Sequence, residues 1–176
     1  DSPPAGLAPP VEQALTAISR HLLKSDFDAA RTVLANSLQH SVDSEAKETL
    51  TRTAGLLRAI AGMSDYIEQQ FIERVGREVT IVHNGQERTL LLRAVAAGRV
   101  NAEMETEEGA RPVSFNIDQL NPSERNRWIG APDTPAKAAM KLILYYEAGK
   151  REEAHRMAAR CGLLSDAFAE ALRNPG

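Results

Sequence analysis

Apolar residues recur every three or four positions on both sides of a central stretch, in which they instead alternate with polar residues. A first stripe with helical spacing begins after Pro10 and runs to about Lys24, and a second begins two or three residues later. The stripes consist of Val11, Leu15, Ile18 and Leu22, then Phe27, Ala30, Val33, Leu34 and Leu38. Because so short a connection makes two helices run antiparallel, the pattern predicts a helical hairpin.

A third helical segment extends from Asp43 or Ser44, either of which can cap a helix, to about Val75. Gly55 and Gly62 interrupt it, and each glycine inside a helix costs about 1 kcal/mol relative to alanine. We therefore expect either a kink near residues 62–64 or two separate helices. Close packing against a neighbouring helix is the alternative reason for the glycines.

Start and stop signals divide the C-terminal part of the chain into further helices. Asn121–Pro122 and Thr134–Pro135 each combine a capping side chain with a proline in the first turn, which predicts a helix start. Gly149 is expected to end the helix that starts at Thr134–Pro135, and Gly162 the helix that follows it. A last helix is expected around Phe168.

From Gly76 the apolar period changes to two, which is typical of strands. Four short strands are expected, at residues 79–83, 89–95, 99–106 and 113–117. Asn84–Gly85 between the first two is a strong hairpin-turn signal, because both residue types accept positive φ. Such a sheet must curl into a small barrel or lie against helices to cover its apolar face. The sequence thus predicts an α+β fold, with a four-stranded antiparallel meander or small SH3-like barrel inserted between helical hairpins.

This organisation divides the chain into four segments. They are a proline-rich linker at 1–10, a helical segment at 11–75, a β meander or barrel at 76–120 and a second helical segment at 121–176. We expect the two helical segments to pack together. The linker lacks the basic start and apolar run of a signal peptide, but it would suit a stalk left after removal of a signal or anchor. The sequence leaves the location open between an exported or periplasmic protein, after removal of a signal or anchor, and a cytoplasmic one.

Two stretches, residues 21–38 and 145–161, resemble the inter-helix corner of a tetratricopeptide repeat. In that family a small residue closes the first helix, an aromatic or long residue follows two positions later, and an alanine comes three positions after that. The matching residues are Ser25, Phe27 and Ala30 in the first stretch, and Gly149, Arg151 and Ala154 in the second. True repeats recur at about 34 residues, whereas these alanines are much farther apart. The resemblance therefore implies hairpins with closely approaching helices at Ala30 and Ala154, without a tandem array.

The β segment and the helix after it resemble a small SH3-like barrel of the SLA1-homology type. In that type the last strand runs through F-x-I into L-x-x-x-E-R and a short helix. The matching residues are Phe115, Ile117, Leu120, Glu124, Arg125 and Trp128. The resemblance implies an interaction or accessory module, of a kind often attached to larger bacterial proteins.

Composition excludes several classes of protein. With 43% hydrophobic, 26% charged and 5% aromatic residues, the chain is typical of a soluble globular protein. The net charge is −3, and no segment is basic enough to suggest nucleic-acid binding. No run approaches the roughly 18 apolar residues of a membrane span, so direct membrane insertion is not expected.

The usual signatures of catalysis and metal binding are missing from the sequence. No P-loop, dinucleotide glycine motif, HExxH, GxSxG or CxxC occurs, and the four histidines lack ligand spacing. Cys161, the only cysteine, falls in a helical apolar pattern and is expected to be a small core residue. The acidic residues from Glu103 to Glu108 suit a solvated strand edge. We therefore expect no enzyme activity, no cofactor and no metal.

A basic-aromatic stripe on the helix from Pro135 is the first candidate binding site. Lys137, Lys141 and Tyr145 recur every four positions, on the side turned away from the apolar face. In tetratricopeptide-type hairpins the first helix lines a groove, where lysines can hold the carboxylates of a peptide. The simpler alternative is a solvated helix face.

The barrel surface around Arg93 and Trp128 is the second candidate site. Trp128 could stack on a ligand, or it could fill the junction between the barrel and the C-terminal helices. The predicted function is a non-catalytic module that binds a protein or peptide partner, as an accessory part of a larger or exported bacterial assembly. The alternative is a ligand-sensing domain of a membrane-anchored signalling protein such as a kinase. An enzyme without a recognisable motif is the third reading.

Overall fold

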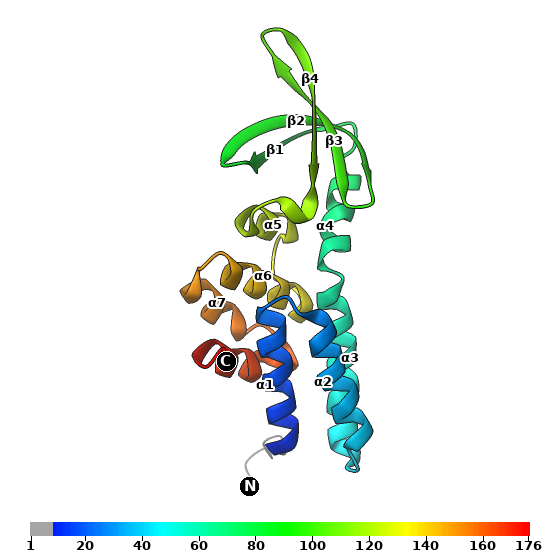
Figure 1. The fold of residues 1–176 in the computed structure, drawn as a ribbon, viewed down its shortest axis with the longest axis vertical. Helices are drawn as coiled ribbons and strands as arrows, with labels where there is room; N and C mark the ends of the chain where they lie inside the picture. The colour runs from blue at the N-terminus through cyan, green and yellow to red at the C-terminus, as the bar shows by residue number, and fades with distance from the viewer. Residues whose placement is uncertain (1–8) are drawn as a thin grey trace. The chain divides into compact units, whose positions relative to one another are not determined.

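The computed structural model describes residues 9–176, which form two compact units. The helical unit contains the described residues up to Ala61 together with residues 132–176, and the sheet unit contains residues 62–131. Eight α-helices and one four-stranded antiparallel sheet make up the described part of the chain (Figure 1). The predicted α+β fold with a strand meander is confirmed.

Six helices and a short 3₁₀ turn build the helical unit. They are α1 (Pro9–Leu23), α2 (Phe27–His40), α3 (Ser44–Ala61), α6 (Pro135–Glu147), α7 (Arg151–Ala158), η2 (Gly162–Leu164) and α8 (Ser165–Arg173). Helix α1 packs against α2 and α8, and α3 packs against α2 and α6. Residues from before and after the sheet unit therefore share one apolar core.

The predicted linker at residues 1–10 overlaps the first helix. Residues 1–8 lie outside the described part of the chain, and Pro9 already belongs to α1. Proline is tolerated in the first turn of a helix, because the amide that it lacks would have no partner there. The helix therefore begins two residues earlier than its apolar stripe.

Both inter-helix corners have the backbone geometry of a tight helical hairpin. At the first corner Ser25 has φ 57°, and the Asp26 carboxylate accepts a hydrogen bond from the Ala29 amide at 3.0 Å. At the second corner Gly149 has φ 75°. Ala30 and Ala154, which follow these corners, are both fully buried. The likeness to tetratricopeptide corners stays a prediction.

The long helical segment after Asp43 is two helices, α3 and α4 (Met63–Ile72), with Gly62 between them. The Asp43 carboxylate accepts a hydrogen bond from the Ala46 amide at 2.8 Å. Apart from its chain neighbours and the backbone of its own helix, no heavy atom lies within 4 Å of where a β-carbon on Gly55 would stand. Close packing therefore does not explain the glycine inside α3.

The sheet unit is an antiparallel meander with a helix on each side of it in the chain. After α4 come β1 (Glu78–His83), β2 (Gln86–Ala96), β3 (Arg99–Thr106), β4 (Gly109–Asn116), η1 (Ile117–Gln119) and α5 (Pro122–Ile129). The strands lie in the order β1-β2-β3-β4, with a register shift between Leu92 and Ala94. Asn84 and Gly85, between β1 and β2, both have positive φ, at 52° and 73°.

Helices α4 and α5 belong to the sheet unit, whereas the sequence grouped them with the helical segments. The unit begins at Gly62 and ends at Ala131, beyond the expected limits of 76 and 120. The reason lies in the aromatic core, where Phe71 of α4 lies between Phe115 of β4 and Trp128 of α5. Both helices therefore cover the apolar face that the sheet could not leave open.

Candidate functional site

The stripe formed by Lys137, Lys141 and Tyr145 is not the open basic surface that its spacing suggested. Lys141 is buried, with 9% of its surface exposed, and Tyr145 packs partly buried against the helical core. Lys137 is mostly covered and forms an ion pair with Asp133 at 3.1 Å. The residues from Ala138 to Leu144 are all buried, so α6 is a central helix without a free face.

Burial of Lys141 affects the charge of its ammonium group. Burial lowers the pKa of Lys141, because the charged form loses water, and the nearby positive charge of Lys137 lowers it further. A lysine that is both covered and close to a second lysine is poorly suited to hold the carboxylate of an incoming peptide. Its placement therefore gives the peptide prediction no support.

Trp128 lies in the core of the sheet unit. Its indole is stacked on Phe71 at 3.9 Å between ring centroids, and the guanidinium of Arg74 lies over it at 5.1 Å. Arg93, the other residue expected on this surface, is exposed and forms an ion pair with Glu103 at 2.8 Å. Arg93 is accessible to a partner, whereas the Trp128 ring is already covered.

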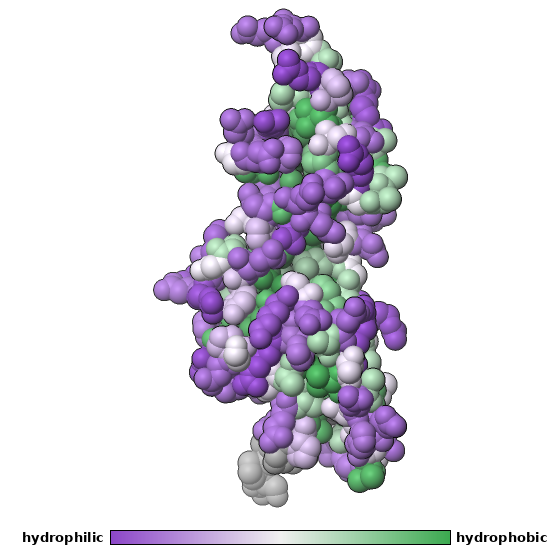
Figure 2. All heavy atoms as spheres, in the orientation of Figure 1, coloured by the Kyte–Doolittle hydropathy of each residue, from purple (hydrophilic) through white to green (hydrophobic). Residues whose placement is uncertain are grey.

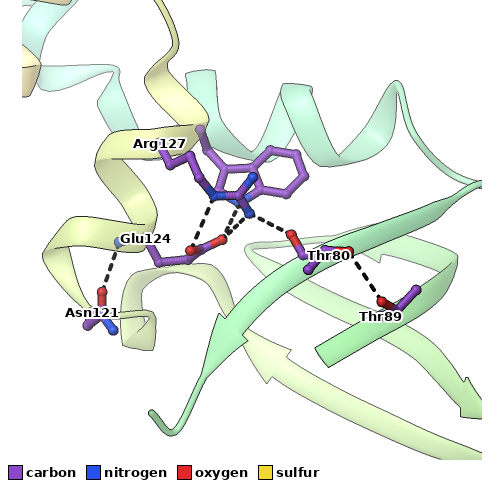
Figure 3. Close-up of polar contacts among 6 residues, drawn as sticks. Thr80, Thr89, Asn121, Glu124 and Arg127 are labelled. Carbon is purple, nitrogen blue, oxygen red and sulfur yellow. Dashed lines mark hydrogen bonds and ion pairs between the residues drawn. The ribbon is translucent and has the colours of Figure 1, made fainter. Parts of the chain in front are cut away.

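Glu124, Arg127 and Trp128 of α5 form a polar network with the edge strand β1 (Figure 3). The buried Glu124 carboxylate accepts hydrogen bonds from the Trp128 Nε1 at 3.0 Å and from two nitrogens of Arg127. Arg127 also donates from Nη2 to the carbonyl oxygen of Thr80 at 2.6 Å. Asn121 starts the helix, because its Oδ1 accepts from the Glu124 amide at 2.8 Å.

This network explains why the acidic residue in α5 is buried. A buried carboxylate is tolerated where charge-assisted hydrogen bonds replace its lost water, and Glu124 has such bonds from Arg127. Since Arg127 bonds to Thr80 as well, the network holds α5 against β1. We therefore assign Glu124 and Arg127 a structural role.

A hollow of about 330 Å³ lies on the outer face of the sheet. Its walls come from all four strands and carry mostly charged or polar side chains. They are Glu78, Glu87, Arg88, Thr89, Leu91, Glu103, Met104, Glu105 and Ala110. Thr89 is also bridged to Thr80 of β1, with 3.2 Å between their hydroxyl oxygens. Four of the lining residues are glutamates, so the hollow is negatively charged.

A different kind of surface lies between α2 and α3. There an open hollow of about 260 Å³, which we call the α2–α3 groove, has a mainly apolar lining. One wall is a helical stripe of α2 and the other a stripe of α3. The lining residues are Arg31, Leu34, Ala35, Leu38, Ala54, Leu57 and Arg58. Figure 2 shows apolar side chains reaching the surface among charged ones over α2.

The α2–α3 groove combines an apolar floor with positive charge. Leu34 and Leu57 are buried at its base, and Ala35 and Ala54 leave room because their side chains are single methyl groups. Arg31 is paired with Asp28 at 2.8 Å. Within residues 9–176, no carboxylate lies within 4 Å of the Arg58 guanidinium. This groove offers apolar contact and an available cation side by side.

The pattern of apolar residues does not predict the α2–α3 groove, for a physical reason. The stripe that contains Leu34 and Leu38 predicts one helix of a hairpin, but not which edge of that stripe stays open. The groove appears only when α2 is paired with α3. Ala35 on α2 and Ala54 on α3 then leave space beside the leucines. The local signal was Arg31, which falls on the same helical face as Leu34 and Leu38.

Comparison with known proteins supplies no relative: no protein-family model, curated protein or solved structure matches the chain. Among residues 9–176, no three His, Cys, Asp or Glu side chains are grouped so that they could hold a metal ion. No helix in the same range has both the length and the apolar character needed to cross a bilayer.

Proposed function

We propose that the protein is a non-catalytic protein-binding module, and that its α2–α3 groove holds an apolar partner segment carrying an acidic residue. It would serve as an accessory part of a larger or exported bacterial assembly. The observation that carries this proposal is the exposed apolar lining between two helices, with Arg31 and Arg58 beside it.

The shape of the groove favours a helical or extended peptide as its occupant. Two neighbouring helices form a trough into which an amphipathic helix can lay its apolar face, with anchors three or four positions apart. Burying one leucine side chain in such a trough contributes about 1.5 to 3 kcal/mol. Two or three anchors contribute about 3 to 9 kcal/mol before the entropy lost on binding, so we expect a weak complex with a dissociation constant of about 0.1 mM or higher.

The charge of the groove favours an acidic residue in the partner. Arg58 has no carboxylate neighbour in the described part of the chain, and a partner carboxylate would give its guanidinium a charge-assisted hydrogen bond. Arg31 stands on the facing helix and already holds Asp28, which is itself exposed. A partner acid could therefore bind Arg58 without first breaking an ion pair.

Selection from a displayed random-peptide library against the folded chain tests this proposal. The enriched peptides should share two apolar residues three or four positions apart and at least one acidic residue. Arg31→Glu with Arg58→Glu should abolish their binding, and amide shifts in the parent should map to residues 31–38 and 54–58.

The matched control is Arg52→Glu with Arg156→Glu. Both arginines are exposed and each has an ion pair within its own helix, with Glu48 and with Glu152. This pair changes the net charge by the same amount outside the groove, so it should keep peptide binding. Equal loss in both double variants, or enriched peptides without acidic residues, would contradict the proposal.

The second candidate function is a ligand-sensing domain. The hollow on the outer face of the sheet supports it, because about 330 Å³ falls within the range of small-ligand sites. Its carboxylates, Glu78, Glu87, Glu103 and Glu105, would select a cationic ligand. Thermal melts of the chain with spermidine and with a neutral polyol would separate the two functions. A sensor of cations should show a higher melting midpoint with spermidine and an unchanged midpoint with the polyol.

A further inference from the structure

A second groove, between α1 and α8, is lined by both apolar and acidic side chains, so its charge is opposite to that of the α2–α3 groove. It encloses about 410 Å³ and we call it the α1–α8 groove. Its lining residues are Glu12, Leu15 and Thr16 from α1, Leu163 from η2, and Asp166, Ala167 and Glu170 from α8.

The two helices that form this groove pack against each other. Near their C-terminal ends, the Nε of Arg20 donates a hydrogen bond to the carbonyl oxygen of Asn174 at 2.8 Å. Near their N-terminal ends, Glu12 lines the same hollow as Leu163 and Asp166. These contacts frame a hollow of about 410 Å³, which is large enough for side chains of a partner segment.

The floor of the groove is apolar and one wall projects outward. Leu15 and Ala167 are buried at the base, whereas Leu163 is one of the few large apolar side chains that stay exposed, at 38%. An exposed leucine beside a buried apolar floor gives a partner side chain two surfaces to contact. Such a surface suits an amphipathic peptide better than a purely ionic ligand.

The rim of the groove carries three carboxylates in different states. The Glu170 carboxylate already has partners, because Asn174 and Arg173 each donate a hydrogen bond to it at 2.9 Å. These bonds lower the pKa of Glu170, and the bond from Asn174 has the larger effect. Glu12 and Asp166 differ from it, since no Lys, Arg or His nitrogen lies within 4 Å of either carboxylate in the part of the chain described. Two negative charges therefore face the groove without a cation of their own.

We propose that the α1–α8 groove binds a basic amphipathic helix of a partner protein. Apolar residues of that helix would contact Leu15, Leu163 and Ala167, and its lysine or arginine side chains would pair with Glu12 and Asp166. Because the α2–α3 groove carries arginines, the two surfaces select partners of opposite charge. This inference does not depend on the function proposed for the α2–α3 groove.

The test uses the full chain and two fluorescent helical peptides, with leucines three and four positions apart. In one peptide the remaining positions are lysine, and in the other they are glutamate. In fluorescence anisotropy titrations the lysine peptide should bind and the glutamate peptide should not. Glu12→Gln with Asp166→Asn should weaken binding of the lysine peptide about tenfold, as should Leu163→Ser alone.

The control is Glu107→Gln with Glu108→Gln, which removes the same charge from two exposed residues in the β3–β4 turn. This variant should bind the lysine peptide as the parent does. Arg31→Glu with Arg58→Glu should also leave it bound, which separates this test from that of the α2–α3 groove. Amide shifts in the parent should centre on Thr16 and Ala167, which tests the site even where a variant folds poorly.

Several outcomes would overturn the proposal. Equal weakening by the groove pair and the turn pair would mean that only the net charge attracts the peptide. Complete displacement of the lysine peptide by spermine, at the same concentration of positive charge, would mean that the apolar floor of the groove contributes nothing to binding. Concentration-dependent self-association of the parent that disappears in Leu163→Ser would assign the groove to a second copy of this chain.

Discussion

The indole of Trp128 in α5 is stacked on the ring of Phe71 in α4, with the two planes inclined by 22°. The sheet unit therefore has an aromatic centre that joins two helices distant in sequence. Phe115 of β4 meets the edge of the same Phe71 ring at 5.9 Å between centroids. One side chain of α4 thus connects the strand meander to the helix that follows it.

Shortening Trp128 should destabilise the sheet unit in two steps. Trp128→Phe keeps an aromatic ring but removes the hydrogen bond to Glu124, so it should lower the free energy of unfolding by about 1 to 2 kcal/mol. Trp128→Ala also leaves a cavity and should lower it by about 3 to 5 kcal/mol. Hydrogen exchange of the strand amides measures both effects. Unchanged protection in Trp128→Ala would refute the assignment of this ring to the core.

Enlarging the buried alanines should destabilise the helical unit. Ala30 and Ala154 have no exposed surface, so Ala30→Leu or Ala154→Leu should lower the free energy of unfolding by about 1 to 3 kcal/mol. Thermal melts followed by circular dichroism measure the effect. Ala59→Leu is the control, because Ala59 is exposed on α3 and should keep the parent midpoint. Parent-like midpoints in both buried variants would contradict close helix approach at the corners.

Gly85→Val should loosen the first β hairpin alone. Gly85 has φ 73°, and no heavy atom lies within 4 Å of where its β-carbon would stand, so the penalty comes from the backbone. A left-handed conformation costs a side chain on the order of 1 to 2 kcal/mol. Hydrogen exchange should accelerate at residues 79–92. Gln86→Val, the next residue, is the control, and equal protection in the two variants would exclude a strained turn.

Ser19→Ala should stabilise the helical unit. Ser19 is buried, and its Oγ has no hydrogen-bond partner among residues 9–176. Removing this hydroxyl should raise the free energy of unfolding by about 1 kcal/mol. Ser37→Ala is the comparison, because the Ser37 hydroxyl donates to the Val33 carbonyl oxygen at 2.8 Å. Urea unfolding should rank Ser19→Ala above Ser37→Ala, and the reverse order would mean that the Ser19 hydroxyl has a partner in solution.

Cys161 should resist alkylation in the folded protein. Burial raises the pKa of its thiol to about 12 from the usual 9.0. Three pKa steps correspond to about a thousandfold less thiolate at pH 8, and the thiolate is the reactive form. Mass spectrometry after iodoacetamide treatment should show modification only once urea unfolds the chain. Rapid labelling of the folded chain would contradict the burial.

The same shift sets the sign of a pH effect. Above pH about 9 the unfolded chain loses the Cys161 proton while the folded chain keeps it, so the folded state loses stability as pH rises toward 12. Cys161→Ala should flatten this decline in melts between pH 8 and 10. An equal decline in both proteins would mean that other groups control the alkaline limit.

Helix starts were predictable from sequence because they depend on neighbours in the chain. Thr134 illustrates this, since its hydroxyl oxygen accepts from the Lys137 amide at 3.2 Å, only three residues away. The same holds for the Asn84–Gly85 turn, where the residue types alone indicate the backbone conformation. Signals of this range identified the elements, and with them the α+β class.

Burial of α6 could not be predicted in this way. The spacing of Lys137, Lys141 and Tyr145 describes one face of an isolated helix. Helices α1 and α3 both pack against α6, and these contacts join residues far apart in the sequence. Membership of α4 and α5 in the sheet unit depends on the same kind of distant contact.

The interrupted helical unit has a consequence for folding during synthesis. A ribosome releases the whole of residues 62–131 before it releases α8, the helix that packs against α1. The strands can therefore pair early, because each contacts the next one along the chain. Helices α1 to α3 can pair with one another first, but α6 and α8, which complete their core, emerge last. Until then the apolar residues that will become their shared core face water, which makes the nascent chain prone to chaperone binding and aggregation at that stage.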